Sequence, residues 1–164
     1  RVLKARSWMR FNTSRSTGMN NIDKFDILTG KILAKLYETF PVKTSLLPED
    51  FGVKDAMREF LNGGKSEAVD MAELEFFAAS VSWLLENEII VAKKGGLGIY
   101  YECGLSFKGL RLLKAVPPSI DSDRKSIGES LSEFAKAGFE DGLKKAMSAL
   151  IVYAGAWVKN KIGG

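Results

Sequence analysis

The sequence predicts a mainly α-helical protein with one small β-hairpin. Apolar residues recur at three- and four-residue steps in several segments, as they do on the buried face of a helix. This period changes over residues 89–103, where two runs of β-branched and aromatic residues flank a glycine-rich loop. A further helical pattern follows Pro117-Pro118. We therefore expect a helical domain with a hairpin, followed by a C-terminal helical extension.

The first predicted helix spans residues 24–40. Its apolar stripe includes Ile32 and Leu36, with charged residues on the other faces. Asp23 and Asp26 are candidate N-caps, because their carboxylates can accept hydrogen bonds from the free amides of the first turn. The following proline ends the helix, since it disfavours helical geometry in the residue before it.

Two further helices are predicted before the hairpin. Residues 41–52 are expected to form an ordered loop, and residues 53–61 a short helix that stops at Asn62-Gly63-Gly64. The next helix begins at residue 70 or 71 and ends at residue 86. Its apolar stripe is wider than the narrow seam of a coiled coil.

The hairpin is predicted from residues 88–92 and 99–103, joined by the glycine-rich loop. We interpret the loop as a turn, because a phosphate-binding loop would lead from a strand into a helix and carry Lys-Ser or Lys-Thr. A closing helix is expected over residues 104–113, with Ser106 as its cap, and Pro117-Pro118 ends it.

Residues 19–118 are predicted to form one domain and residues 119–164 a helical tail. The linker expected at residues 117–126 spans the boundary between them. The tail is expected to be helical from about residue 127 to 161, with a break near Gly138 or Gly142. We interpret one apolar face of it as a dimerisation or docking surface, with a membrane surface as the alternative partner. That face consists of Leu143, Met147, Leu150, Ile151, Ala154, Trp157 and Val158. Its apolar run is shorter than the ~20 residues that cross a bilayer, so no transmembrane segment is predicted.

The net charge of +4 belongs to the first 18 residues. They hold five basic residues and no acid, which leaves 19 basic and 20 acidic residues, a net charge of −1, over residues 19–164. We expect this leader to be disordered. Three interpretations stay open: a basic arm for nucleic acid or another anionic surface, an organellar transit peptide, or sequence upstream of a natural start at Met19.

The composition argues against an enzyme. The chain has no histidine and one cysteine, which excludes histidine-dependent nucleophiles, clusters of cysteine ligands and intrachain disulfides. We expect Cys103 to be a small core side chain, and no cofactor or metal is predicted. The cysteine content fits a reducing compartment, so a cytoplasmic location is predicted.

Residues 24–116 resemble the winged helix-turn-helix superfamily, in particular small bacterial winged-helix proteins. The order of three helices, a hairpin and a closing helix carries the resemblance, as do Ile89-Ile90-Val91 and the glycine-rich tip. The segment 105–110 is similar to the Leu-Thr-x-x-Gly pattern that often follows the wing, with Ser in the place of Thr. The resemblance implies that the third helix enters the DNA major groove and that the wing touches the flanking backbone.

The charges favour only the second of these contacts. Residues 66–88 hold six acids and no Lys or Arg, so the third helix is a poor reader of DNA. Residues 89–116 carry a local net charge of +4 and could contact phosphates. The candidate contacts are Lys93, Lys94, Lys108, Arg111 and Lys114. The alternative is that these residues are ordinary solvated cations.

The aromatic residues allow a second hypothesis. Phe76, Phe77, Trp83, Tyr100 and Tyr101 could line a ligand cavity, but their presence on several faces of the third helix favours an interface with another protein. The leading interpretation is a dimeric, DNA-associated transcriptional regulator that contacts duplex DNA through its wing and closing helix. The alternative is a protein-interaction module that uses the acidic third helix and the amphipathic C-terminal helix without binding DNA.

Overall fold

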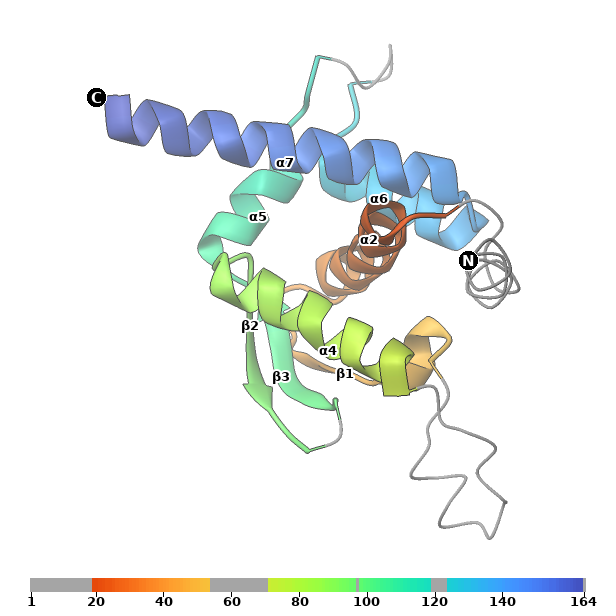
Figure 1. The fold of residues 1–164 in the computed structure, drawn as a ribbon. Coiled ribbons are helices and arrows are strands. Elements are labelled where there is room, and N and C mark those ends of the chain that lie inside the picture. The colour runs from red at the N-terminus through yellow and green to blue at the C-terminus, as the bar shows by residue number, and fades with distance from the viewer. Residues whose placement is uncertain (1–18, 54–70, 97, 119–123, 164) are drawn as a thin grey trace, which may run out of the picture.

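The computed structural model describes residues 19–53, 71–96, 98–118 and 124–163, with side chains as far as residue 156. The described chain is mainly helical, with a three-stranded antiparallel sheet, which confirms the predicted class of a mainly α protein with a small β part (Figure 1). In chain order the elements are α2 (Asn21–Thr39), β1 (Thr44–Leu46), the 3-10 helix η1 (Pro48–Phe51), α4 (Met71–Glu86), β2 (Ile90–Lys94), β3 (Tyr100–Leu105), α5 (Phe107–Lys114), α6 (Ile127–Ala137) and α7 (Glu140–Gly163).

Helix α2 starts earlier than its apolar pattern indicates. Asn20 is its N-cap, and the Asn20 Oδ1 accepts a hydrogen bond from the backbone N–H of Asp23 at 2.9 Å. The predicted caps were therefore wrong: Asp23 lies in the first turn, and Asp26 is a buried residue of the helix. The predicted end is confirmed, because Phe40, which precedes the proline, takes an extended ψ of 137°.

The sheet contains one strand more than the predicted hairpin. Strand β1 and helix η1 both form within residues 41–52, which were predicted to be a loop. β1 pairs with one edge of β3 (Thr44 opposite Cys103) and β2 with the other (Ile90 opposite Leu105), so the strand order is β1-β3-β2. Apart from Val53, the predicted short helix at 53–61 lies outside the described residues.

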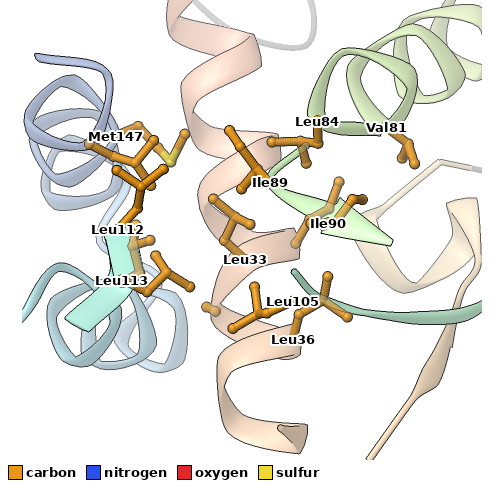
Figure 2. Packing of buried hydrophobic residues seen from close by; sticks show 14 of the residues in the cluster. Leu33, Leu36, Val81, Leu84, Ile89, Ile90, Leu105, Leu112, Leu113 and Met147 are labelled. Carbon is orange, nitrogen blue, oxygen red and sulfur yellow. The ribbon is translucent and has the colours of Figure 1, made fainter. Parts of the chain in front are cut away.

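Helix α2 lies at the centre of a hydrophobic core. Figure 2 shows its Leu33 between side chains of α5 and α7 on one side and side chains of α4, β2 and β3 on the other. Leu33 and Leu36 are both fully buried. A helix that is apolar on successive residues must be covered from several sides, and here the covering elements range from α4 to α7, the last helix of the chain.

Helices α6 and α7 contribute to this same core. A Cβ built at Gly30 of α2 would lie only 3.2 Å from Leu143 of α7 and 3.3 Å from Leu131 of α6, so these helices approach α2 closely. The break between them falls at Gly138, as predicted, with a left-handed φ of 67°. The segment predicted to be a separate tail, residues 119–164, thus supplies part of the core of residues 19–118.

Ser106 and Gly109 fix α5 against the start of β2. The Ser106 Oγ accepts a hydrogen bond from the Gly109 N–H at 2.9 Å, which confirms the predicted cap. The same hydroxyl can donate to the carbonyl of Glu88 or of Ile89, at 2.5 and 2.9 Å. Gly109 is needed for this approach, because a Cβ there would overlap the Ile89 carbonyl oxygen. The base of the hairpin is therefore held by α5.

Candidate nucleic-acid interface

The loop between β2 and β3 is a turn, as predicted. The Gly95 N–H donates to the Ile99 carbonyl at 2.8 Å, and the Ile99 N–H donates to the Gly96 carbonyl at 3.1 Å. Gly98 has a φ of 76°, in the left-handed region that favours glycine. This turn forms the tip of the hairpin, at the end away from α5 (Figure 1).

A β-bulge in β3 changes which side chains of the hairpin face the solvent. The register advances by two residues on β2, from Val91 to Lys93, but by three on β3, from Gly104 to Tyr101. Glu102 lies in this bulge with a φ of 50°, so that Tyr101 and Glu102 are both exposed and do not alternate between the two faces of the sheet.

Lys93 and Lys94, the two phosphate contacts predicted for the hairpin, are exposed near the tip. The Lys93 Nζ lies 2.8 Å from the Glu102 Oε2. This hydrogen bond raises the pKa of the Lys93 ammonium and lowers the pKa of the Glu102 carboxyl, which the nearby charge of Lys43 lowers further. Tyr101 is 47% exposed beside them, and its ring packs where a Cβ of Gly95 would lie.

We define the hairpin surface as these five exposed residues: Lys43, Lys93, Lys94, Tyr101 and Glu102. Three ammonium groups against one carboxylate give it a net charge of +2, and an aromatic ring lies among them. The sequence did not point to three of its members as parts of this surface. Lys43 was assigned to a loop, and strict alternation places Tyr101 and Glu102 on opposite faces. A non-glycine bulge leaves no clear signal in a single sequence.

The three predicted cations of the closing helix lie elsewhere. The Lys108 Nζ donates to the Asn87 carbonyl at 3.0 Å, at the turn between α4 and β2. The Arg111 guanidinium lies 6.0 Å from the centre of the Phe107 ring, and Lys114 is exposed in the last turn of α5. Because α5 follows the base of the hairpin, these three residues form a second group, separated from Lys93 and Lys94 by the length of β2.

The exposed face of α4 is acidic, in agreement with the expected repulsion of DNA. Glu75, Ala79 and Glu86 are exposed, whereas Ser82, predicted to face outward, is half-buried 3.4 Å from the Tyr100 hydroxyl. Residues 71–86 contain no Lys or Arg. Carboxylates on this face would repel backbone phosphates in the major groove.

Of the other aromatic residues predicted for an interface, two are buried and two are half-buried against α2. Phe77 and Tyr100 are fully buried. Trp83 packs edge-on against Phe25 of α2 with ring centres 5.1 Å apart. Phe76 lies beneath the ammonium of a lysine of α2, 4.6 Å from the ring centre. The aromatic residues that widen the stripe of α4 thus cover the N-terminal half of α2.

The predicted dimer face of α7 is divided in two by the structure. Leu143, Met147 and Leu150 are fully buried within the chain, which corrects their assignment to an interface between molecules. Ile151 is 42% exposed and Ala154 is half-buried. The side chains of the other two predicted members, Trp157 and Val158, lie outside the described residues.

The described residues show no cluster suited to metal chemistry. No group of three or more His, Cys, Asp or Glu in residues 19–53, 71–96, 98–118 and 124–163 could hold a metal ion. Burial raises the pKa of the Cys103 thiol, so the nucleophilic thiolate is disfavoured. Within the same residues, no helix combines the length and the apolar character needed to cross a membrane.

Comparison with known proteins adds no functional assignment. Protein-family models, curated proteins and solved structures were each searched, and none of the three searches found a match. The function is therefore argued from the geometry of the chain itself.

Proposed function

We propose that this chain is a non-enzymatic winged-helix protein of the cytoplasm that associates with duplex DNA as a regulator. The element order supports the fold: a helix, a strand, a helix and a two-stranded hairpin, with the first strand paired beside the hairpin. The hairpin then corresponds to the wing and α4 to the third helix.

The hairpin surface carries the proposal. The bulge at Glu102 leaves Tyr101 exposed opposite Lys93, and lysine and tyrosine side chains are common donors to phosphate oxygens. Lys108, Arg111 and Lys114 extend the basic character toward the base of the hairpin. The acidic face of α4 argues against base reading, so the expected binding is led by the phosphate backbone and is weakly specific.

Removing the two tip lysines is expected to weaken DNA binding and its salt dependence. With about four phosphates neutralised, the logarithm of the binding constant should fall with that of the salt concentration at a slope near −4. For Lys93→Gln/Lys94→Gln the slope should drop to about −2. Fluorescence anisotropy on a random labelled duplex between ~50 and ~200 mM salt measures both slopes.

The control for this experiment is Lys145→Gln, which removes an exposed charge from α7 and should leave the slope within about one unit of the wild type. All three proteins keep the basic leader, so its charge cannot account for a difference between them. Equal slopes for the wild type and the double variant, or no binding at ~50 mM salt, would reject the proposal.

A second candidate function is protein interaction without DNA. The acidic face of α4 favours it, and so do the exposed apolar side chains of α7. Ile151 is 42% exposed, Val152 71% and Tyr153 40%, on a helix that extends past the body of the molecule (Figure 1). A second copy of the chain is the partner that we propose for this part of α7, which leaves Leu143, Met147 and Leu150 in the core.

A charge at the most exposed of these positions is expected to disrupt the dimer. Val152→Asp should weaken association at least tenfold, because the contact would bury an unpaired carboxylate. Sedimentation equilibrium over a range of chain concentrations from ~1 μM up to ~0.1 mM measures the dissociation constant, since a micromolar dimer and a tenfold weaker one differ over this range. Ala79→Asp, which adds the same charge to the exposed face of α4, is the matched control. A wild-type chain that is monomeric at the highest of these concentrations contradicts the dimer.

A further inference from the structure

A pocket of about 310 Å³ lies where α2, η1 and α6 meet, away from the hairpin surface. This volume is at the lower end of the range typical of small-molecule sites. Lys31, Ala34, Lys35 and Glu38 line it from α2, and their spacing of three and four residues places them on one face of that helix. The other two elements form the remaining walls of the pocket, which is open to solvent.

The charged groups of the pocket leave one cation in excess. The Lys35 Nζ lies 2.9 Å from the Asp50 Oδ2 and donates to the Ser45 carbonyl at 3.0 Å. The Lys136 Nζ lies 2.6 Å from the Glu38 Oε1. Lys31 is the third cation, and the described part of the chain offers it no hydrogen bond or ion pair. A ligand with a single negative charge would balance the site.

Ser132 supplies a donor that the fold does not use. It lines the pocket, and its Oγ is buried without a hydrogen-bond partner among the described residues. Buried hydroxyl groups are normally hydrogen-bonded, so an unpaired one needs an explanation. If the Ser132 side chain rotates from its buried position toward the pocket, a carboxylate oxygen bound there would accept a hydrogen bond from this hydroxyl.

The rest of the lining is apolar and held in place. The Phe51 ring stacks on Phe77 with ring centres 5.7 Å apart, and the Lys35 ammonium lies 5.9 Å from the Phe51 ring centre. Ala34 and Ala135 are small side chains of the facing helices α2 and α6. These groups would pack against the hydrocarbon part of a ligand.

We propose that this pocket binds a small organic monoanion, a carboxylate with an apolar body. Lys31 and the Ser132 hydroxyl would bind the carboxylate, and Phe51 with the two alanines would contact the apolar part. The site shares no residue with the hairpin surface, so it stands whether or not the chain binds DNA.

Titration of the full chain with 2-naphthoate, followed by the NMR amide signals of Ala34, Ser132 and Ala135, tests the proposal. Its neutral analogue 2-naphthamide and inorganic phosphate are titrated in parallel. We expect naphthoate to bind at least fivefold more tightly than either, because a charge-assisted contact and an apolar contact act together. Equal affinity for naphthoate and naphthamide, or signal changes confined to other residues, would overturn it. Equal affinity for phosphate would also overturn it.

Two variants separate binding from stability. Lys31→Met keeps the apolar stem and should weaken naphthoate about fivefold while leaving naphthamide unchanged, and Lys145→Met on α7 should change neither. Ser132→Ala should also weaken naphthoate, yet its melting temperature should stay equal or rise, because no hydrogen bond of the free protein is lost. A Ser132→Ala protein that binds naphthoate as tightly as the wild type contradicts the assigned role of the hydroxyl.

Discussion

A chain that ends at Pro118, and so lacks α6 and α7, is expected not to fold. These helices supply five large, fully buried side chains to the core, namely Ile127, Leu131, Leu143, Met147 and Leu150. At about 2 kcal/mol each, their burial is worth roughly 10 kcal/mol, as much as the whole stability of a typical domain. Their loss would also expose the side of α2 around Gly30 to water.

Far-UV circular dichroism and urea unfolding measure this effect. The truncated chain should lack a cooperative transition, whereas a control chain that ends at Ala156 keeps the buried Leu143, Ala146, Met147 and Leu150 of α7 and should retain one. If residues 119–164 were only a dimerisation tail, the shortened chain would instead unfold cooperatively and differ only in mass. A folded, monomeric chain ending at Pro118 would thus refute the shared core.

Gly109→Ala is expected to destabilise the protein by about 3 kcal/mol. The new methyl group would overlap the Ile89 carbonyl oxygen, which is backbone and cannot move aside like a flexible side chain. Relief requires α5 to move away from β2, and this movement would break the hydrogen bonds that the Ser106 hydroxyl donates to the hairpin base. Gly109 lies in the first turn of α5, and alanine normally stabilises a helix more than glycine does. A loss of stability on Gly109→Ala would therefore indicate the steric overlap.

The matched control is the same substitution in open space. A Cβ at Gly96 would meet no atom within 4 Å, so Gly96→Ala should leave the stability unchanged within about 0.5 kcal/mol. Urea unfolding of both variants gives the two free energies. A Gly109→Ala protein as stable as the Gly96→Ala protein would contradict the close packing of α5 on β2.

The long elements of the fold were predictable because each has a periodic apolar face. The patterns of α2 and α4, the change of period at the hairpin and the break at Gly138 all reappear in the structure. Strand β1 was not predictable, because its three residues are too few to show alternation and it forms by pairing with the exposed edge of β3. The cap of α2 was misplaced because Asn20 and Asp23 are both suitable residue types.

The candidate sites were less predictable, because they depend on contacts between distant segments. An amphipathic pattern on α7 cannot distinguish burial within the chain from burial against another molecule. The deciding information lay in α2, where Ile32, Leu33 and Ala34 are all buried and therefore require cover on more than one side. The pocket depends likewise on α2, η1 and α6 meeting, and the first and last of these are about a hundred residues apart in the chain.

The rate at which an alkylating reagent modifies Cys103 reports how often the core around β3 opens. Cys103 is the only thiol in the sequence, lies fully buried in β3 opposite Thr44, and has a pKa raised by burial. An alkylating reagent can react only when the core elements packed over this thiol move away from it. The rate of Cys103 modification therefore depends on how often the core opens at β3, the strand that joins the candidate wing to the core. The measurement needs no label on the protein.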